Sequence, residues 1–97
     1  MQDTLSSVGR FPTSHASKYL QQLCRHFAHK IDVTYDETSA EAALPPGPCK
    51  MSADEMELQI EITAQDVEGL EVAKRIIDSH LERFAFREEF KTMDWAA

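Results

Sequence analysis

The sequence predicts an α+β fold, an antiparallel sheet of four to six strands with two helices packed on one face. Two apolar patterns with a helical period, one in each half of the chain, predict the helices. Segments in which apolar and polar residues alternate predict the strands. The 97 residues, 42% of them hydrophobic, suit a single domain over residues 1–97 with one core. The expected order is β-α-β-β-β-β-α, followed by a short C-terminal strand or an extended tail.

The N-terminal third predicts a strand and a helix. Residues 5–11 alternate modestly and predict an edge strand that ends at Pro12, whose ring removes an amide donor and disfavours helix in the preceding residue. Thr13 or Ser14 is placed to cap a helix that runs from about residue 14 to residue 29. The apolar residues of this helix recur at helical spacing: Ala16, Tyr19, Leu20, Leu23, Cys24 and Phe27.

The middle of the chain predicts four strands. Residues 31–35 alternate as a half-buried strand does, and the apolar positions of residues 40–44 fit its hairpin partner. Three prolines in residues 45–48 lack amide donors, which predicts a stiff loop. Residues 49–53 then predict a short strand, and residues 56–62 give the strongest alternation in the chain. One face of the sheet is therefore expected to be apolar and the other solvated.

The C-terminal third predicts a long helix and a docked tail. Thr63 and Asp66 have the spacing of a capping box and predict a helix that reaches about Arg87. Its apolar residues again recur at helical spacing: Val67, Leu70, Ala73, Ile77, Leu81 and Phe84. The other large apolar residues are expected to pack in the core, to wall a cleft or to anchor the tail: Phe27, Met51, Met56, Phe84, Phe86, Phe90, Met93 and Trp95.

Composition and charge exclude several classes of protein. A formal net charge of −7 argues against a nucleic-acid partner, because such binding depends on neutralising phosphates. There is no apolar run of about eighteen residues, so we expect no membrane span. The N-terminus has no signal-peptide pattern, which favours a cytoplasmic protein. Cys24 and Cys49 are too few for a disulfide scaffold and are expected to be free thiols.

The charge is unevenly distributed along the chain. Residues 1–30 carry four basic residues and one acidic residue, whereas residues 31–71 carry eleven acidic residues and one basic residue. One interpretation is that carboxylates solvate one face of the sheet. The other is that the basic side receives an anion while the acidic side keeps the protein soluble.

Histidines and cationic residues gather near the ends of both predicted helices. His26 and Lys30 share a flank of the first helix, and His80, Arg83 and Arg87 share a flank of the second. If these flanks face each other, the five side chains converge on one cleft that suits an anionic ligand. The alternative is structural, with His26 at the edge of the core, His80 hydrogen-bonded within it, and the arginines paired with acidic residues.

Catalytic and metal-binding patterns are weak. The sequence has no Gly-rich phosphate loop, no Gly-x-Ser-x-Gly elbow and no His-Glu-x-x-His helix. Cys24 and His26 diverge by roughly 200° around the first helix, so they form neither a zinc shell with His29 nor a nucleophile and base. We therefore expect no catalytic residue, no metal and no cofactor.

Two motifs resemble a bacterial family of unknown function, DUF2218. They are SKYLxxLCxHFxHK at residues 17–30 and SHLERFAFRE at residues 79–88, and the likeness extends to the Asp-Glu-Thr turn at residues 36–38 and the Asp-Trp pair at residues 94–95. The resemblance implies a small α+β domain without an established activity. Because some members look associated with siderophore-interacting iron-uptake proteins, it also implies an accessory role in iron or ferric-siderophore metabolism.

These observations favour a non-enzymatic binding or accessory module. Its ligand would be an anionic small molecule or an acidic segment of a partner, and a ferric siderophore has the right sign of charge. The alternative is a homodimeric protein-interaction domain without a small-molecule ligand, in which the cleft is a packed seam. An enzyme of an unrecognised type is the third hypothesis.

Overall fold

A computed structural model describes residues 4–88 and 92–95 of the chain. The elements are β1 (Leu5–Pro12), α1 (Ala16–Phe27), β2 (Val33–Tyr35), β3 (Ser39–Leu44), β4 (Gly47–Ala53), β5 (Glu57–Ala64), α2 (Val67–Phe84), the 3₁₀ helix η1 (Phe86–Glu88) and β6 (Asp94–Trp95). The predicted α+β class and the order β-α-β-β-β-β-α are confirmed, and β6 is the short strand expected at the C-terminus.

The sheet has the strand order β2-β3-β4-β5-β1-β6, and each neighbouring pair is antiparallel. Strands β2 to β5 follow one another through short turns. Strand β1 pairs with β5 along its whole length, from Leu5 opposite Ala64 to Pro12 opposite Glu57. The prediction of β1 as an edge strand was wrong, because β6 covers Gly9 and Arg10 on its other side.

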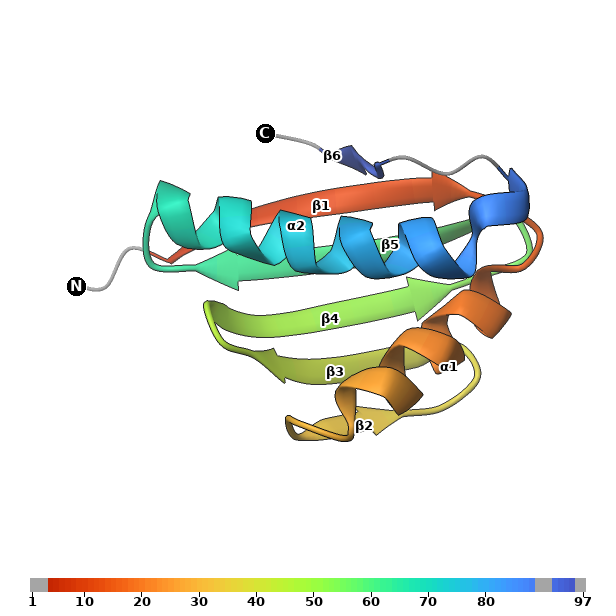
Figure 1. The fold of residues 1–97 in the computed structure, drawn as a ribbon, viewed down its shortest axis with the longest axis horizontal. Coiled ribbons are helices and arrows are strands. Elements are labelled where there is room, and N and C mark those ends of the chain that lie inside the picture. Colours follow the sequence, from red (N-terminus) through yellow and green to blue (C-terminus); the bar gives the residue numbers. More distant parts are fainter. Residues whose placement is uncertain (1–3, 89–91, 96–97) are drawn as a thin grey trace.

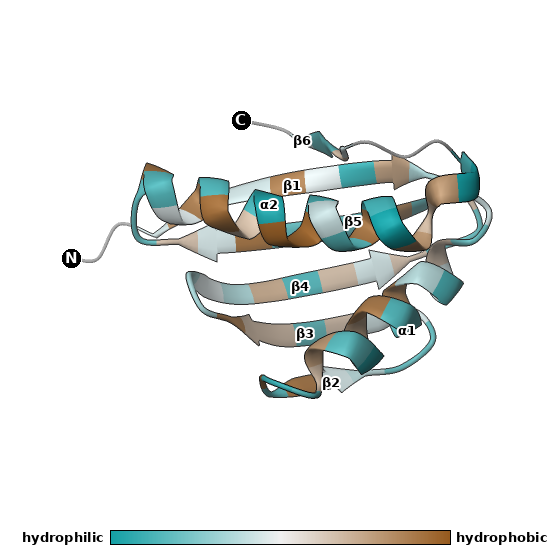
Figure 2. Ribbon diagram, viewed as in Figure 1, coloured by the Kyte–Doolittle hydropathy of each residue, from teal (hydrophilic) through white to brown (hydrophobic). Residues whose placement is uncertain are grey.

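Both helices lie on the same face of the sheet, as predicted (Figure 1). Hydrophobic and hydrophilic segments alternate along both helices, as expected for elements with one apolar face (Figure 2). The alternation predicted for β5 is also present: Leu58, Ile60, Ile62 and Ala64 are buried, and the residues between them are partly exposed. The core therefore lies between the helices and one face of the sheet.

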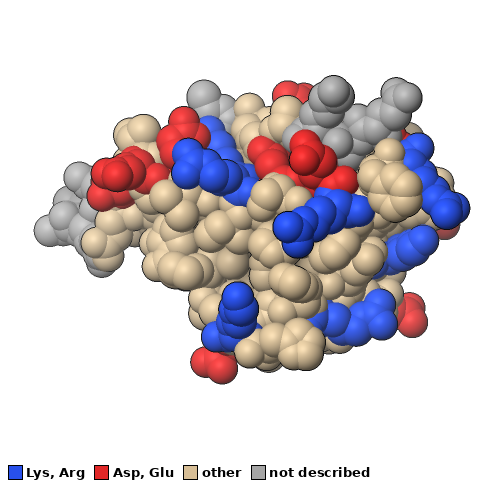
Figure 3. Space-filling model, viewed as in Figure 1, with Lys and Arg blue, Asp and Glu red and all other residues tan. Residues whose placement is uncertain are grey.

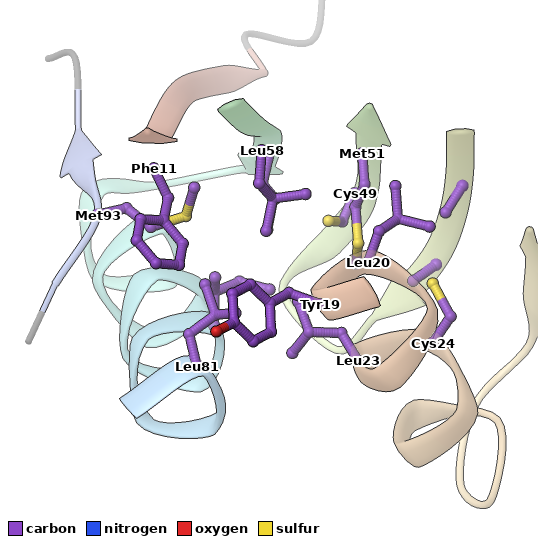
Figure 4. Close-up of a cluster of buried hydrophobic side chains, with 14 of the residues drawn as sticks. Phe11, Tyr19, Leu20, Leu23, Cys24, Cys49, Met51, Leu58, Leu81 and Met93 are labelled. Atoms are coloured by element: carbon purple, nitrogen blue, oxygen red, sulfur yellow. The ribbon is translucent and has the colours of Figure 1, made fainter. Parts of the chain in front are cut away.

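The core joins residues from both helices and from the central strands. Leu20 and Leu23 of α1 belong to the same cluster as Met51 of β4 and Leu58 of β5, and the side chain of Leu81 of α2 lies next to Tyr19 (Figure 4). Burying a side chain the size of leucine stabilises the fold by about 1.5–3 kcal/mol. This shared core fixes how the two helices sit relative to each other.

Helix α1 is shorter than predicted at both ends. It begins at Ala16, and its N-cap residue, His15, makes no side-chain cap. Thr13 Oγ1 instead accepts the amide of His15 at 3.1 Å and holds the turn before the helix. At the other end, the amides of Lys30 and Ile31 both donate to the carbonyl of Phe27, so the chain leaves the helix there and residue 29 lies outside it.

Helix α2 also differs from the prediction at its two ends. Its N-cap is Asp66, whose carboxylate accepts the amide of Gly69 at 2.7 Å. Thr63 has no part in this cap, because it belongs to β5 and donates its hydroxyl to the carbonyl of Pro48 at 2.6 Å. The helix ends at Phe84 rather than near residue 87, and η1 follows it.

The proline-rich stretch is only half a loop. Residues 45 and 46 form the turn, but β4 already begins at Gly47, and Pro48 pairs with Ala43. The amide of Ala43 donates to the carbonyl of Asp32 on the far side of β3, so this pair requires no amide from Pro48. The prediction of a loop over residues 45–48 was therefore wrong for its last two residues.

Two residues expected to pack in the interior lie at the surface. Met56 is 79% exposed, because the carboxylate of Asp54 accepts the amides of Met56 and Glu57 and turns the chain before β5 begins. Phe86 is 65% exposed in η1. Met51 and Met93 are buried as predicted. The expectation for Phe90 lies outside the described residues.

The C-terminal segment is anchored on β1 and α2. The ring of Trp95 covers Gly9, where a Cβ atom would come within 2.7 Å of it. The carboxylate of Asp78 accepts hydrogen bonds from the indole of Trp95 and from the amide of Met93. The prediction of Trp95 as a tail anchor is confirmed. Within the described residues, no helix combines the length and the apolar content that a membrane crossing requires.

Candidate functional site

The rings of His26 on α1 and His80 on α2 meet between the helices. Their centroids are 4.6 Å apart, and the ring planes are inclined at 57°. The ring of Phe27 lies 5.1 Å from that of His80, and the ring of Phe84 lies 6.1 Å from that of His26. The two imidazoles thus sit on an aromatic base, with His26 exposed and His80 half-buried.

The backbone of α2 fixes which nitrogen of His80 carries a hydrogen. Nδ1 of His80 lies 2.6 Å from the carbonyl oxygen of Ile76. A carbonyl oxygen only accepts, so Nδ1 is the donor and Nε2 is left for another partner. The hydrogen bond that the sequence required of a histidine on this face is present.

Cationic neighbours surround His26. The pKa of His26 lies below its ordinary value of 6.5, first because burial disfavours the imidazolium and then because His80, His29, Lys30 and Arg83 add positive charge nearby. The structure therefore brings together four of the five residues predicted for the site. We call His26, Lys30, His80 and Arg83 the helix-pair patch.

Arg87 is placed elsewhere. It belongs to η1, and its guanidinium lies 5.7 Å from the centroid of the Phe86 ring. Figure 1 shows η1 and the turn between α1 and β2, which contains Lys30, at opposite ends of the helix pair. Because α2 stops before Arg87, the regular helical spacing that aligned it with His80 and Arg83 is lost.

Glu88 forms a second polar cluster that the sequence did not predict. Its carboxylate accepts hydrogen bonds from the hydroxyl of Tyr19 and from Thr13 Oγ1, the latter at 2.8 Å. Burial and the adjacent carboxylate raise the pKa of Tyr19 to about 12. Within residues 4–88 and 92–95, neither Arg83 nor Arg87 forms an ion pair with a carboxylate, so the alternative that pairs these arginines with acidic residues is not seen in this part of the chain.

Helix polarity explains part of the basic character of this region. Arg25 and His26 lie in the last turn of α1 and Arg83 in the last turn of α2, where cations complement the partial negative charge of a helix C-terminus. On the face shown in Figure 3, acidic side chains gather along and above α2, whereas the lower half over α1 carries mostly basic ones. Helix polarity does not account for two imidazoles from different helices in contact.

The patch is a surface rather than a deep cavity. A shallow hollow of about 520 Å³ adjoins it and is lined by residues of the turn after α1, including His29, Lys30 and Asp32. A larger hollow of about 580 Å³ lies on the other side of α2, beside Trp95. A ligand of the patch would therefore be held by charge and hydrogen bonds more than by enclosure.

A metal-binding cluster and a reactive thiol are both absent from the described residues. They contain no cluster of three or more His, Cys, Asp or Glu side chains that could hold a metal ion. Burial raises the pKa of Cys24 to about 11 and that of Cys49 to about 12, so both thiols stay protonated at neutral pH. Both are free and buried. Neither is suited to nucleophilic catalysis.

Fold and site together define a small two-layer α+β domain with a basic patch between its two helices. The family model of DUF2218, described as an uncharacterized protein conserved in bacteria, matches residues 8–96. The chain therefore belongs to the DUF2218 family, as the two sequence motifs suggested.

The fold recurs in a solved structure. The NMR structure of PA4090 from Pseudomonas aeruginosa superposes with a TM-score of 0.77 at 22% sequence identity, covering 94% of each chain. At this identity the likeness establishes the fold alone. No curated protein matches the chain significantly.

Proposed function

We propose that the protein is a non-enzymatic cytoplasmic binding module that takes up an anionic group at the helix-pair patch. The observation that carries the proposal is the contact between His26 and His80, flanked by Lys30 and Arg83. Among the described residues, no carboxylate forms an ion pair with any of the four. Such a patch is unexpected on a chain with a net charge of −7 unless it serves an anion.

The patch offers several kinds of donor to one anion. Arg83 presents a planar fork that matches carboxylate and phosphate oxygens, and Lys30 presents a flexible ammonium. His80 contributes Nε2, because its Nδ1 is held by Ile76. Because the patch is open to solvent, its affinity would fall as salt concentration rises.

A ferric siderophore is one ligand of the proposed class. Its link to this protein comes from the family resemblance, and what supports it here is the sign of the charge on the patch. An acidic segment of a partner protein would use the same donors. The shared chemistry is a carboxylate-like or phosphate-like group, and the titrations below use simple probes of that chemistry.

An NMR titration with citrate and with sulfate tests the proposal. Amide shifts are expected to move around His26, Lys30, His80 and Arg83. Arg83→Gln should weaken binding about tenfold, the equivalent of one hydrogen bond to a charged group. Arg75→Gln is the matched control, since Arg75 lies on the same helix beside the hollow near Trp95. Shifts confined to residues 31–62, or equal losses in both variants, would count against the patch.

A second candidate is a homodimeric interaction domain. Met56 and Phe86 are exposed apolar side chains at one end of the molecule. They are neighbours in the fold, because the amide of Thr13 donates to the carbonyl of Met56 while its hydroxyl donates to Glu88 of η1. Light scattering would show twice the 11.0 kDa chain mass, and Phe86→Ser would restore the monomer. A monomer at high concentration excludes this candidate.

A further inference from the structure

We infer that the helix-pair patch takes up a proton together with its anion. The contact between the two rings opposes a positive charge on His26 beside the imidazole of His80, and a bound anion offsets that repulsion so that His26 takes up a proton. This inference rests on the proposed function and adds how binding is regulated: affinity rises as pH falls through the range in which histidine titrates.

The first argument is the distance between the rings. Centroids 4.6 Å apart place two positive charges in contact if both imidazoles are protonated. Like charges at this distance repel strongly, particularly where the aromatic rings of Phe27 and Phe84 exclude water from one side. Two imidazoles in contact therefore carry two positive charges only where a counter-ion lies beside them.

The second argument is the fixed tautomer of His80. Its Nδ1 donates to the carbonyl of Ile76 whether the ring is neutral or charged. Only Nε2 changes its role, as an acceptor in the neutral ring and a donor in the protonated one. An anion offers acceptors only. Neutral His80 therefore presents a lone pair to the anion, and protonation converts it into a donor.

Positive charge surrounds the pair. His29 and Lys30, in the turn after α1, and Arg83, on α2, add positive charge near His26. The strands beneath α1 turn their carboxylates, Glu41 and Glu61, toward the open face of the sheet, in the same row as Lys50. The cationic neighbours keep the pKa of His26 below its ordinary value, and a bound anion would oppose that effect.

Calorimetric titration with sulfate tests the inference, because sulfate keeps its charge across the range used. Titrations at pH 7.5, 6.5 and 5.5 and constant ionic strength should show affinity rising by up to about tenfold per pH unit, the limit for one coupled proton. Repeating each titration in two buffers of different ionisation enthalpy counts the protons taken up. The uptake should be greatest between the pKa values of His26 without and with sulfate, and it should not exceed one proton per sulfate if His26 alone is involved.

Variants assign the proton to the pair. His26→Gln should flatten the pH dependence, and because His26 is exposed the variant should fold. His80→Gln should do the same, with its folding checked by NMR. His15→Gln is the matched control, because His15 precedes the same helix at its other end, beside Tyr19, and should keep the full dependence.

The outcomes separate the two proposals. Absence of sulfate binding at every pH would refute the proposed function and this inference with it. Binding that neither changes with pH nor takes up protons would refute the inference alone. A pH dependence that persists unchanged in His26→Gln and in folded His80→Gln would place the proton elsewhere and would also overturn the inference.

Discussion

Replacing Asp78 with alanine tests how the C-terminal segment is held on the fold. The carboxylate of Asp78 accepts hydrogen bonds from Thr92 Oγ1 at 2.6 Å, from the amide of Met93 at 3.0 Å and from Trp95 Nε1 at 3.1 Å. One side chain on α2 thus binds three residues of the segment that ends in β6. Its removal should release the segment while leaving α2 and the central sheet in place.

The expected loss follows from these three hydrogen bonds. A hydrogen bond to a charged group contributes about 1.5–3 kcal/mol, but bonds that share one carboxylate do not add fully. Because the site is also partly exposed, we expect Asp78→Ala to lower the free energy of unfolding by about 2–4 kcal/mol. For a domain of this size that is about 10–20 °C in Tm.

The chain contains a single tryptophan, which makes the assay specific. Trp95 fluorescence reports the segment itself, and far-UV circular dichroism reports the helices and the sheet. Asp78→Ala should shift Trp95 emission to the red under native conditions with little change in circular dichroism. Gly9→Ala should give the same shift by another route, because its Cβ would come within 2.7 Å of the indole ring.

A control and a contrary result complete this test. Glu82→Ala removes an acid from the same helix whose side chain makes no hydrogen bond or ion pair within the described residues, and it should change stability by less than about 0.5 kcal/mol. If Asp78→Ala melts within about 2 °C of the wild type and leaves Trp95 emission unchanged, the argument that Asp78 anchors the segment is wrong.

Three further measurements test pKa shifts. Cys24 and Cys49 should react with a thiol reagent at neutral pH only as fast as the protein unfolds, and rapid labelling of the folded protein would contradict their burial. Because the pKa of Tyr19 is raised to about 12, the unfolded chain loses this proton first, so stability should fall as pH rises from about 10 to 12. Tyr19→Phe should lack that loss in alkaline denaturation curves; an unchanged curve would exclude Tyr19 as its source. Because the pKa of His26 is lowered in the folded protein, the unfolded chain binds more protons below about pH 6.5, so the free energy of unfolding should fall as pH falls. His26→Gln should reduce this pH dependence in urea titrations. An unchanged pH dependence in the variant would show that another group causes it.

The parts of the fold that the sequence predicted depend on periodicity. The alternation of β5 and the apolar stripe of α1 are patterns within single segments, and the core requires both. Element ends depend on particular hydrogen bonds. The helical spacing continues from Phe84 to Arg87 without a glycine or proline to stop it, yet α2 ends at Phe84 and the next turn is held by the hydrogen bonds of Glu88 to Thr13 and Tyr19. Thr13 and Tyr19 lie about seventy residues before Glu88 in the sequence, so the local sequence pattern does not predict these hydrogen bonds.

The candidate site was predictable only in part, for the same physical reason. Helical projection placed His26 and His80 each on a flank of its own helix, but only the common core shows that these flanks face each other and that the rings are in contact. The same projection included Arg87, which the early end of α2 carries away. Met56 is the corresponding case in a strand. The alternation predicts that its side chain is buried, but Met56 lies in the turn that the carboxylate of Asp54 stabilises, before β5 begins.

The position of β1 between β5 and β6 has a consequence for folding. Strands β2 to β5 close through short hairpins and α2 follows β5 directly, so these contacts cost little loop entropy. Strand β1 must instead pair with a strand far along the chain, because Pro12 pairs with Glu57 and Leu5 pairs with Ala64, sequence separations of 57 − 12 = 45 and 64 − 5 = 59 residues. We therefore expect the hairpins and α2 to form the folding nucleus and β1 to join after the rate-limiting barrier. Destabilising substitutions in β1 would then accelerate unfolding far more than they slow folding.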